Sequence, residues 1–289
     1  MSDVCMRMDD MVSKYLRTGT FPVAIKIYKK GEEPPMKAKA PLADFKHCLA
    51  ICQGVTMARR LGSVLKFSKE DQSCPIAQVI LGYVDEPDFV KDGSLIHPLY
   101  ACDLETGKKT QDSTPKMSKA DTGTIVVAPL SRANFEPDVI IIYGNPAQIV
   151  RCIQGALYKE GGYIEARFAG RGACGGEITI PYTQQKYNII NPGGGERVFA
   201  LTADDEMAFA IPSSKFESFI EGVIATHKGG VARIPTPFAG INMEPKWPPS
   251  YSELRKYADS WEAEDEATLE EFKEEITQAD DQEASRGTV

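Results

Sequence analysis

The sequence predicts an α/β fold in which a mixed sheet carries helices on its faces, and three observations support this. Two near-continuous apolar runs, "TIVVAPL" and "DVIIIYG", are typical of strands that are covered on both faces. Segments with helical spacing and clear capping residues alternate with such runs. An apolar share of 42% over 289 residues is ordinary for a globular protein and supplies a core.

Local patterns predict the elements of the first half in order. Residues 4–16 place their apolar side chains on one helical face, and "FPVAIKIY" then has the composition of a strand. "DFKHCLAICQGVTMARRLG" predicts a helix that is capped by Asp44 and ended by Gly62. "VLKFS" predicts a short strand, and "CPIAQVILGY" a helix with Pro75 in its first turn. Residues 85–120 are polar, and we expect a long irregular excursion there.

The second half repeats this alternation and ends in an acidic tail. A helix with Asn145 as its N-cap follows "DVIIIYG", and "YIEARF" and "EMAFAIP" predict strands. "SSKFESFIEGVIATHKGG" predicts a further helix, and residues 233–249 are expected to wrap the surface. We therefore expect one α/β domain over residues 1–249 and an acidic helical or disordered extension over residues 250–289.

Charge and hydropathy exclude some classes of partner. Residues 251–289 hold 13 acidic and 4 basic residues, whereas the remainder holds 28 and 29, so the body is nearly neutral. A neutral body does not favour nucleic-acid binding, which needs a basic surface. No run of 18 apolar residues predicts a membrane span, and the N-terminus does not resemble a secretion signal. We expect a cytoplasmic protein; the sequence does not indicate its oligomeric state.

The cysteines reveal a repeat. Cys52 and Cys152 lie 100 positions apart, as do Cys74 and Cys174, and each pair is embedded in a similar succession of helix, glycine, short strand, polar turn and cysteine. This pattern predicts an internal duplication with half-repeats at about residues 20–135 and 136–228. Two such halves around a pseudo-twofold axis would bring the four sulfurs together.

Seven cysteines in a reducing cytosol are not expected to form disulfides, so they either pack as small hydrophobic side chains or serve as ligands. The motif C-x-x-C is absent, and distant single cysteines suit a site that the fold assembles. Thiolates bind both zinc and iron–sulfur clusters, and three of them leave one metal position open. Gly172, Gly175 and Gly176 around Cys174 would let backbone amides approach a cluster.

Several stretches together resemble the domain of unknown function 169 family, an uncharacterised ArCR family common in archaea and anaerobic bacteria. They cover roughly residues 20–235, and they are "FPVAIKIYKKGEE", "CQGVTMARRLG", "SCPIAQVILGY", "IVVAPLSRANFEPDVIIIYGNPAQIVRCIQGALYKEGG" and "DDEMAFAIPSSKFESFIEGVIATHKGG". The resemblance implies family cysteines at Cys52, Cys74 and Cys174, and usually another residue at the position of Cys152. It therefore favours a three-cysteine site and brings no activity with it.

We therefore expect an iron–sulfur protein of anaerobic metabolism, with a 4Fe–4S cluster on Cys52, Cys74 and Cys174 and an open iron for a small-molecule substrate. Such a protein would be a lyase or a desulfidase-like enzyme, with His47 and Arg171 as catalytic candidates. In one alternative, Cys152 is the fourth ligand of an electron carrier or cluster-delivery protein with a redox partner. In another, the protein binds a small molecule without metal.

Overall fold

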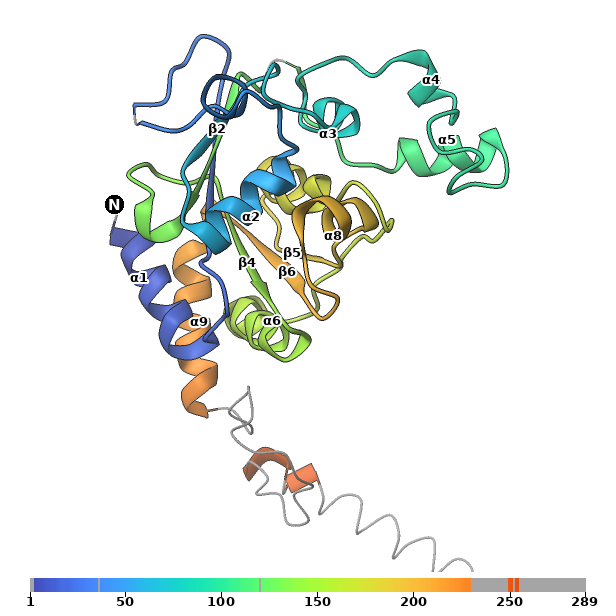
Figure 1. The fold of residues 1–289 in the computed structure, drawn as a ribbon. Helices are drawn as coiled ribbons and strands as arrows, with labels where there is room; N and C mark the ends of the chain where they lie inside the picture. Colours follow the sequence, from blue (N-terminus) through green and yellow to red (C-terminus); the bar gives the residue numbers. More distant parts are fainter. Residues whose placement is uncertain (1–2, 36, 120, 230–248, 252, 255–289) are drawn as a thin grey trace, which may run out of the picture. The chain divides into compact units, whose positions relative to one another are not determined.

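The computed structural model describes residues 3–35, 37–119, 121–229, 249–251 and 253–254 (Figure 1). The chain divides into a compact unit Met1–Pro235 and a second unit Thr236–Val289. The predicted surface-wrapping segment and acidic tail lie almost entirely outside the described residues. Within the described part, no helix combines the length and the apolarity that a membrane crossing requires.

A single open sheet of six strands lies at the centre of the first unit. Its order is β2-β3-β1-β4-β6-β5, and every neighbouring pair is antiparallel. The prediction of an α/β fold is confirmed, but the sheet is not mixed. The apolar runs arise because helices cover both faces, which does not require parallel pairing. The strands are β1 Val23–Tyr28, β2 Leu65–Phe67, β3 Thr124–Pro129, β4 Val139–Gly144, β5 Asn188–Ile190 and β6 Met207–Pro212.

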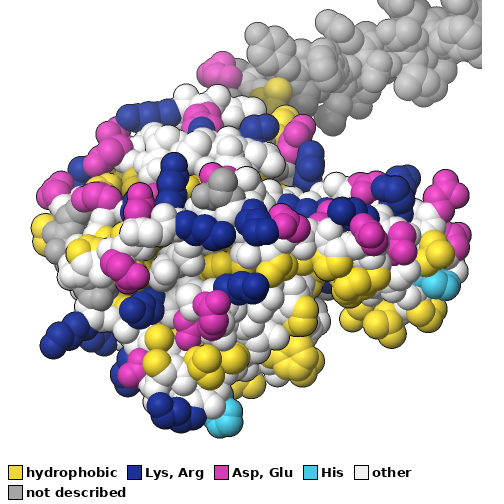
Figure 2. Space-filling view, turned by 90° about the horizontal axis from the view of Figure 1, so that it is seen from above, with side chains coloured by type: hydrophobic (Ala, Val, Ile, Leu, Met, Phe, Trp, Pro, Cys, Tyr) yellow, Lys and Arg dark blue, Asp and Glu magenta, His cyan; other side chains and the backbone are white. Residues whose placement is uncertain are grey.

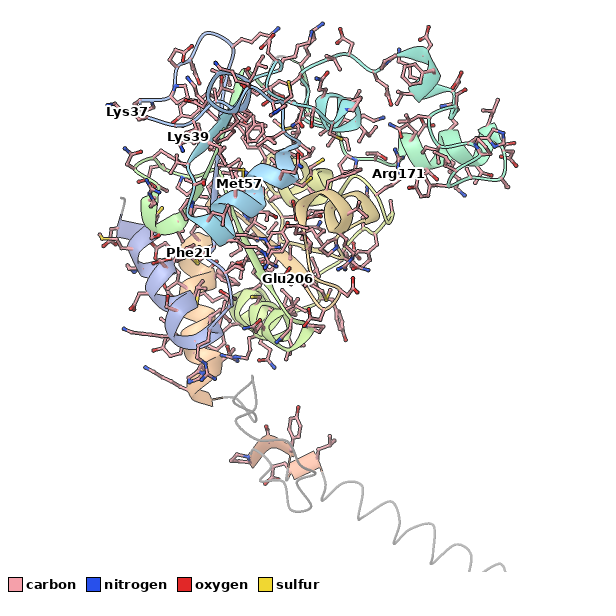
Figure 3. All side chains as sticks on the ribbon, viewed as in Figure 1. Phe21, Lys37, Lys39, Met57, Arg171 and Glu206 are labelled. Carbon is pink, nitrogen blue, oxygen red and sulfur yellow. The ribbon has the colours of Figure 1, made fainter. Side chains whose placement is uncertain are left out.

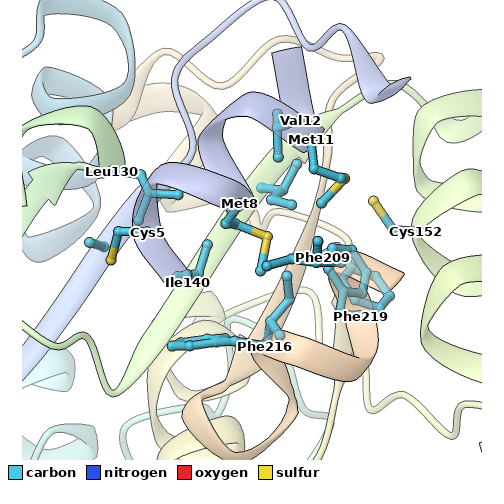
Figure 4. Close-up of a cluster of buried hydrophobic side chains, with 14 of the residues drawn as sticks. Cys5, Met8, Met11, Val12, Leu130, Ile140, Cys152, Phe209, Phe216 and Phe219 are labelled. Carbon is cyan, nitrogen blue, oxygen red and sulfur yellow. The ribbon is translucent and has the colours of Figure 1, made fainter. Parts of the chain in front are cut away.

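Three helices cover one face of the sheet and form what we call the first core (Figure 4). Met8 and Met11 of one helix, Cys152 of the second and Phe219 of the third are all buried against strand residues such as Phe209. The helices are α1 Asp3–Met11, continued by the π-helical turn η1 Val12–Leu16, then α6 Pro146–Glu160 and α9 Phe216–Gly229, which the short turn η5 Ser213–Lys215 precedes.

On the opposite face, several helices pack against the sheet and form the second core. Val55 and Ile80 pack there with Ile178 and Tyr143. The helices on this face are α2 Ile51–Leu61, α3 Pro75–Ile80, η4 Gly175–Thr179, α7 Ile180–Gln184 and α8 Gly194–Ala200. The hydroxyl of Thr56 donates to the carbonyl of Ala200 at 2.7 Å, so α8 is anchored on α2.

The predicted excursion contains two helices, α4 Asp88–Lys91 and α5 Leu104–Asp112, and projects from the rest of the unit (Figure 1). It exposes several hydrophobic side chains, among them Leu99 and Tyr100. In the view from above, hydrophobic side chains gather at the right of the molecule (Figure 2). Two further short turns, η2 Pro41–Phe45 and η3 Leu130–Arg132, complete the elements.

Two predicted elements are wrong, and each has a local cause. The carboxylate of Asp44 accepts the backbone N–H of Ala40 within the turn η2, so Asp44 does not cap α2, which begins only at Ile51. The segment "YIEARF" forms no strand: Tyr163 is 94% exposed, and the neighbour of β6 on that side is β5.

The internal duplication is not confirmed. The strand order is symmetric about the β1–β4 pair, which is what a twofold axis perpendicular to the sheet would produce. Such an axis keeps equivalent elements on one face. The helices that were expected to correspond, α2 and α6, lie on opposite faces instead.

Candidate cysteine site

The fold brings three distant cysteines together on the second face of the sheet. Cys52 lies in the first turn of α2, Cys74 is the N-cap of α3, and Cys174 directly precedes η4. Cys174 is buried, whereas Cys52 and Cys74 are partly buried. Each thiol therefore lies at the beginning of a different helix, where backbone N–H groups without intrahelical partners favour negative charge.

Burial and nearby negative charges favour the protonated form of two of these thiols, Cys52 and Cys174. Burial, followed by the charges of Glu196, Glu177 and Cys74, raises the pKa of Cys52 to about 12. The pKa of Cys174 is raised well above its usual value, first by burial and then by Cys74 and Cys52. The three thiols are thus within electrostatic range of one another. Without a nearby cation, Cys52 and Cys174 are poor nucleophiles, because only the thiolate form of a cysteine attacks an electrophile or binds a metal.

The other cysteines lie apart from this group. Cys152 is fully buried in the first core, on the opposite face of the sheet, among Met11 and Phe219 (Figure 4). The sheet therefore separates Cys152 from the three thiols, which it would join as a fourth ligand only in the alternative of an electron carrier or cluster-delivery protein. Cys5 lies in the same core, while Cys48 and Cys102 are exposed.

The three glycines around Cys174 have close neighbours that account for them. A β-carbon on Gly172, which has a φ of +62°, would meet Ile80, and one on Gly175 would meet Pro115 at 3.1 Å. The N–H of Gly175 donates to the carbonyl of Gly172 at 2.9 Å, so this amide is already used within the turn. A β-carbon on Gly176 would stand 3.0 Å from the carboxamide of Asn188. Close packing thus explains these glycines without a cofactor.

A buried pair of carboxyl groups lies beside the thiols, and our sequence reasoning did not identify it. The hydroxyl of Tyr143 lies 2.5 Å from Oε1 of Glu177 and within hydrogen-bond distance of Oε1 of Glu196. A tyrosine hydroxyl has one proton and can donate to only one of them, so the other carboxyl must carry a proton to complete the arrangement. Burial and mutual repulsion raise the pKa of Glu177 well above its usual range.

The sequence gives a weak indication of the pair Glu177 and Glu196. Glu177 interrupts the small and apolar residues that follow Cys174, and Glu196 lies in the glycine-rich stretch "NPGGGERV", which forms the start of α8 instead of an open loop. Oε2 of Glu196 is buried and has no hydrogen-bond partner in the described part of the chain. Both carboxyls raise the pKa of Cys52 and Cys174, which places them in the same site.

Arg59 supports the base of this site. It is fully buried, and its guanidinium lies 4.1 Å from the centre of the Tyr143 ring. Its Nη1 and Nη2 donate to the carboxylate of Glu206 at 2.6 and 3.0 Å. A buried arginine held in this way fixes the ring whose hydroxyl joins the two carboxyls.

The two catalytic candidates lie in different surroundings. His47 is exposed in the loop before α2 and makes no hydrogen bond or ion pair with any described residue. Arg171 is half-buried, and Cys74 is near enough to influence its pKa. Arg171 also lines a pocket of about 330 Å³ whose wall includes Ala173 and Gly176, on either side of Cys174.

Thiolates can hold either a single metal ion or an iron–sulfur cluster. Among residues 3–229, as far as they are described, no three His, Cys, Asp or Glu side chains are placed to hold one metal ion. In an iron–sulfur cluster each thiolate binds a different iron, so the sulfurs stand farther apart than around one ion. The raised pKa values of Cys52 and Cys174 mean that these two thiols would ionise only beside a positively charged group.

Comparison with known proteins gives a family but no activity. The sequence pattern of domain of unknown function 169, described as uncharacterised ArCR, matches residues 12–222. The uncharacterized protein MJ0308 of Methanocaldococcus jannaschii is 29% identical over 204 residues, which are 70% of this chain and 85% of that protein. No solved structure matches. The chain therefore belongs to the domain of unknown function 169 family.

Proposed function

We propose that this protein is an iron–sulfur enzyme whose cluster is held by Cys52, Cys74 and Cys174. The observation that supports the proposal most is the meeting of three thiols from three separate elements within one desolvated region. A bound 4Fe–4S cluster with three protein thiolates would supply an open iron that polarises a small substrate, as in a lyase or a desulfidase-like reaction. Anaerobic, cytoplasmic metabolism is the setting that suits such a cluster.

The neighbouring carboxyl groups supply what thiols alone lack. Glu177 and Glu196 hold one proton between them beside Tyr143, so the pair is suited both to donate and to accept a proton. Their burial keeps water away from that proton. We therefore assign acid–base chemistry to this pair, and not to the exposed His47.

One observation favours the simpler alternative of a metal-free binding protein. Close packing explains the glycines around Cys174, so they do not require a cofactor. The alternative of an electron carrier with four protein thiolates loses its support, because Cys152 lies in the first core.

Iron and sulfide analysis of anaerobically purified protein tests the proposal. We expect about four iron and four sulfide per chain with a visible charge-transfer band. Each of Cys52→Ala, Cys74→Ala and Cys174→Ala should lose most of this iron. Cys102→Ala, an exposed cysteine, is the matched control and should keep it, and so should Cys152→Ala.

Two results would contradict the proposal. Colourless, iron-free protein from an anaerobic preparation would favour the metal-free alternative. Iron that persists in all three variants would show that the cluster has other ligands. A loss of iron in Cys152→Ala, with the fold intact by circular dichroism, would return Cys152 to the ligand set.

A further inference from the structure

The pocket beside Cys174 has a consistent chemical character. It has a volume of about 330 Å³, at the small end of ligand pockets. Its lining includes two arginines and not one acidic residue. Apolar side chains make up much of the remaining wall, among them Pro115, Phe168 and Ile180. A small organic molecule with an apolar body and a negative end matches this lining.

Arg171 is held in place by a neutral group. Arg171 is labelled in Figure 3. Its Nη1 donates to Oε1 of Gln111, a fully buried side chain of α5, at 3.1 Å. Among the described residues Arg171 makes no ion pair. One N–H of the fork is therefore used for positioning, and the others remain for a ligand.

The acidic residue that Gln111 links to Arg171 does not neutralise the arginine. Nε2 of Gln111 donates a hydrogen bond to Oε1 of Glu86 at 3.2 Å, and Nζ of Lys116 lies 2.7 Å from the same carboxylate oxygen. Glu86 is therefore already paired. The positive charge of Arg171 remains uncompensated within the described structure, although desolvation makes such a charge costly.

Two more donors line the pocket. Arg167 is exposed and makes neither a hydrogen bond nor an ion pair with any described residue. Oδ1 of Asn191 accepts from Arg197 at 3.0 Å, which leaves the amide N–H groups of Asn191 free to donate. Two guanidiniums and an amide around one small space form an arrangement suited to the planar, bidentate geometry of a carboxylate.

We infer that this pocket binds a small organic carboxylate. Arg171 binds the carboxylate group, and Arg167 helps to attract it. The apolar body of the ligand packs against Phe168 and Ile180. Because the wall of the pocket includes both neighbours of the Cys174–Gly175 pair, a bound carboxylate would lie next to the cysteine site. The assignment of this ligand as a substrate depends on the proposed function; the binding itself does not.

Fluorine NMR titration of the anaerobically purified full chain tests the inference. The probes are 4-fluorobenzoate and its neutral counterpart 4-fluorobenzamide, which have nearly the same shape. We expect saturable binding of the benzoate and about tenfold weaker binding of the benzamide, since a charge-assisted bidentate pair is the main difference. Arg171→Gln should weaken benzoate binding about tenfold, and Arg171→Lys less. Arg132→Gln, which changes the net charge equally at an exposed arginine outside the pocket, should bind as the parent does.

Equal binding of the two probes, or unchanged benzoate binding by folded Arg171→Gln, would overturn the inference. Displacement of the probe by inorganic phosphate at lower concentration than by unlabelled benzoate would overturn the choice of a carboxylate. Iron is measured in the same samples, so the two proposals fail separately. Benzoate binding by iron-free protein would support the carboxylate pocket and contradict the iron–sulfur proposal. A normal iron content without benzoate binding would support the iron–sulfur proposal and contradict the carboxylate pocket.

Discussion

At the scale of single residues, the ion pair between the fully buried Arg59 and the partly buried Glu206 decides how well the helix of Cys52 is held. Arg59 belongs to α2, the helix that begins with Cys52, and Glu206 immediately precedes β6. Arg60 adds a third contact at 2.9 Å to the same carboxylate. Removing the carboxylate that is hydrogen-bonded to a buried arginine costs much more stability than breaking an exposed ion pair.

We expect Glu206→Gln to lower the free energy of unfolding by about 3 kcal/mol at pH 7, because a buried charge is left without its partner. Burial alone would raise the pKa of Glu206, but its contacts with Arg59, Ala203 and Arg60 lower it from 4.5 to about 2. A lowered carboxyl pKa adds stability that is complete above about pH 4.5 and is lost as the pH falls through about 2. Urea denaturation between pH 8 and pH 2.5 measures both effects.

The difference between the parent and Glu206→Gln should therefore stay constant from pH 8 to pH 6 and shrink below pH 4.5. Asp112→Asn breaks an exposed pair with Lys108 and is the control, with an expected change of less than about 0.5 kcal/mol. A loss in Glu206→Gln no larger than in this control would show that the pair adds little to stability.

Residues of the site were only partly predictable. Cys52, Cys74 and Cys174 could be singled out because thiols carry few ordinary surface roles. The pair of Glu177 and Glu196 could not be, because an acidic residue in a sequence is ordinary until a fold buries it beside a second one. Tyr143 ends a strand and looks like any strand tyrosine until its hydroxyl reaches both carboxyls.

At the scale of elements, α6 and α9 cross at a point where neither helix can carry a side chain. A β-carbon on Gly222 would meet the carbonyl oxygen of Gly155, and one on Gly155 would meet Val223. Two glycines facing one another let the helix backbones approach, so that both helices cover the first core. Glycine inside a helix costs about 1 kcal/mol relative to alanine, and this contact offsets that cost.

Gly222→Ala is therefore expected to destabilise the protein by about 3 kcal/mol, although alanine is the better helix former. The measurement is the free energy of unfolding in urea. Gly19→Ala provides the control, since a β-carbon there has no neighbour within 4 Å and the change should stay within about 0.5 kcal/mol. A stabilised Gly222→Ala protein would mean that the two helices can separate without loss.

Elements whose ends are fixed by nearby capping residues were predicted well. Elements whose conformation depends on tertiary contacts were not. Helix α6 could be predicted because Asn145 caps it through the N–H of Gln148. The start of α2 could not be, because Lys46 adopts a φ of +60° after η2 and the N–H of Ala50 is satisfied by the side chain of Gln53. The β-branched run after Gly176 forms η4 and α7, since burial against the second core overrides local preference.

At the scale of the whole unit, the sheet divides the cysteines into two groups. Cys5 and Cys152 lie in the first core, and Cys74 and Cys174 belong to the second face. Sequence spacing made Cys152 and Cys52 look like equivalent positions of a repeat. A repeat of similar elements does not indicate which face of the sheet each helix covers. Only the connection from β4 into α6, which places α6 with α1 and α9, separates them.

We expect the unit Met1–Pro235 to fold and remain stable without the rest of the chain. Among the described residues, the last buried member of the cores is Val223, with Ile224 packed against it, and the family match ends at residue 222. A chain ending at Pro235 loses 14 acidic and 5 basic residues, so its net charge changes from −8 to +1. We expect its melting temperature in calorimetry to stay within about 2 °C of the full chain, which corresponds to less than 1 kcal/mol, with unchanged iron content. A shortened chain that melts well below this range would show that residues beyond Pro235 complete one of the cores.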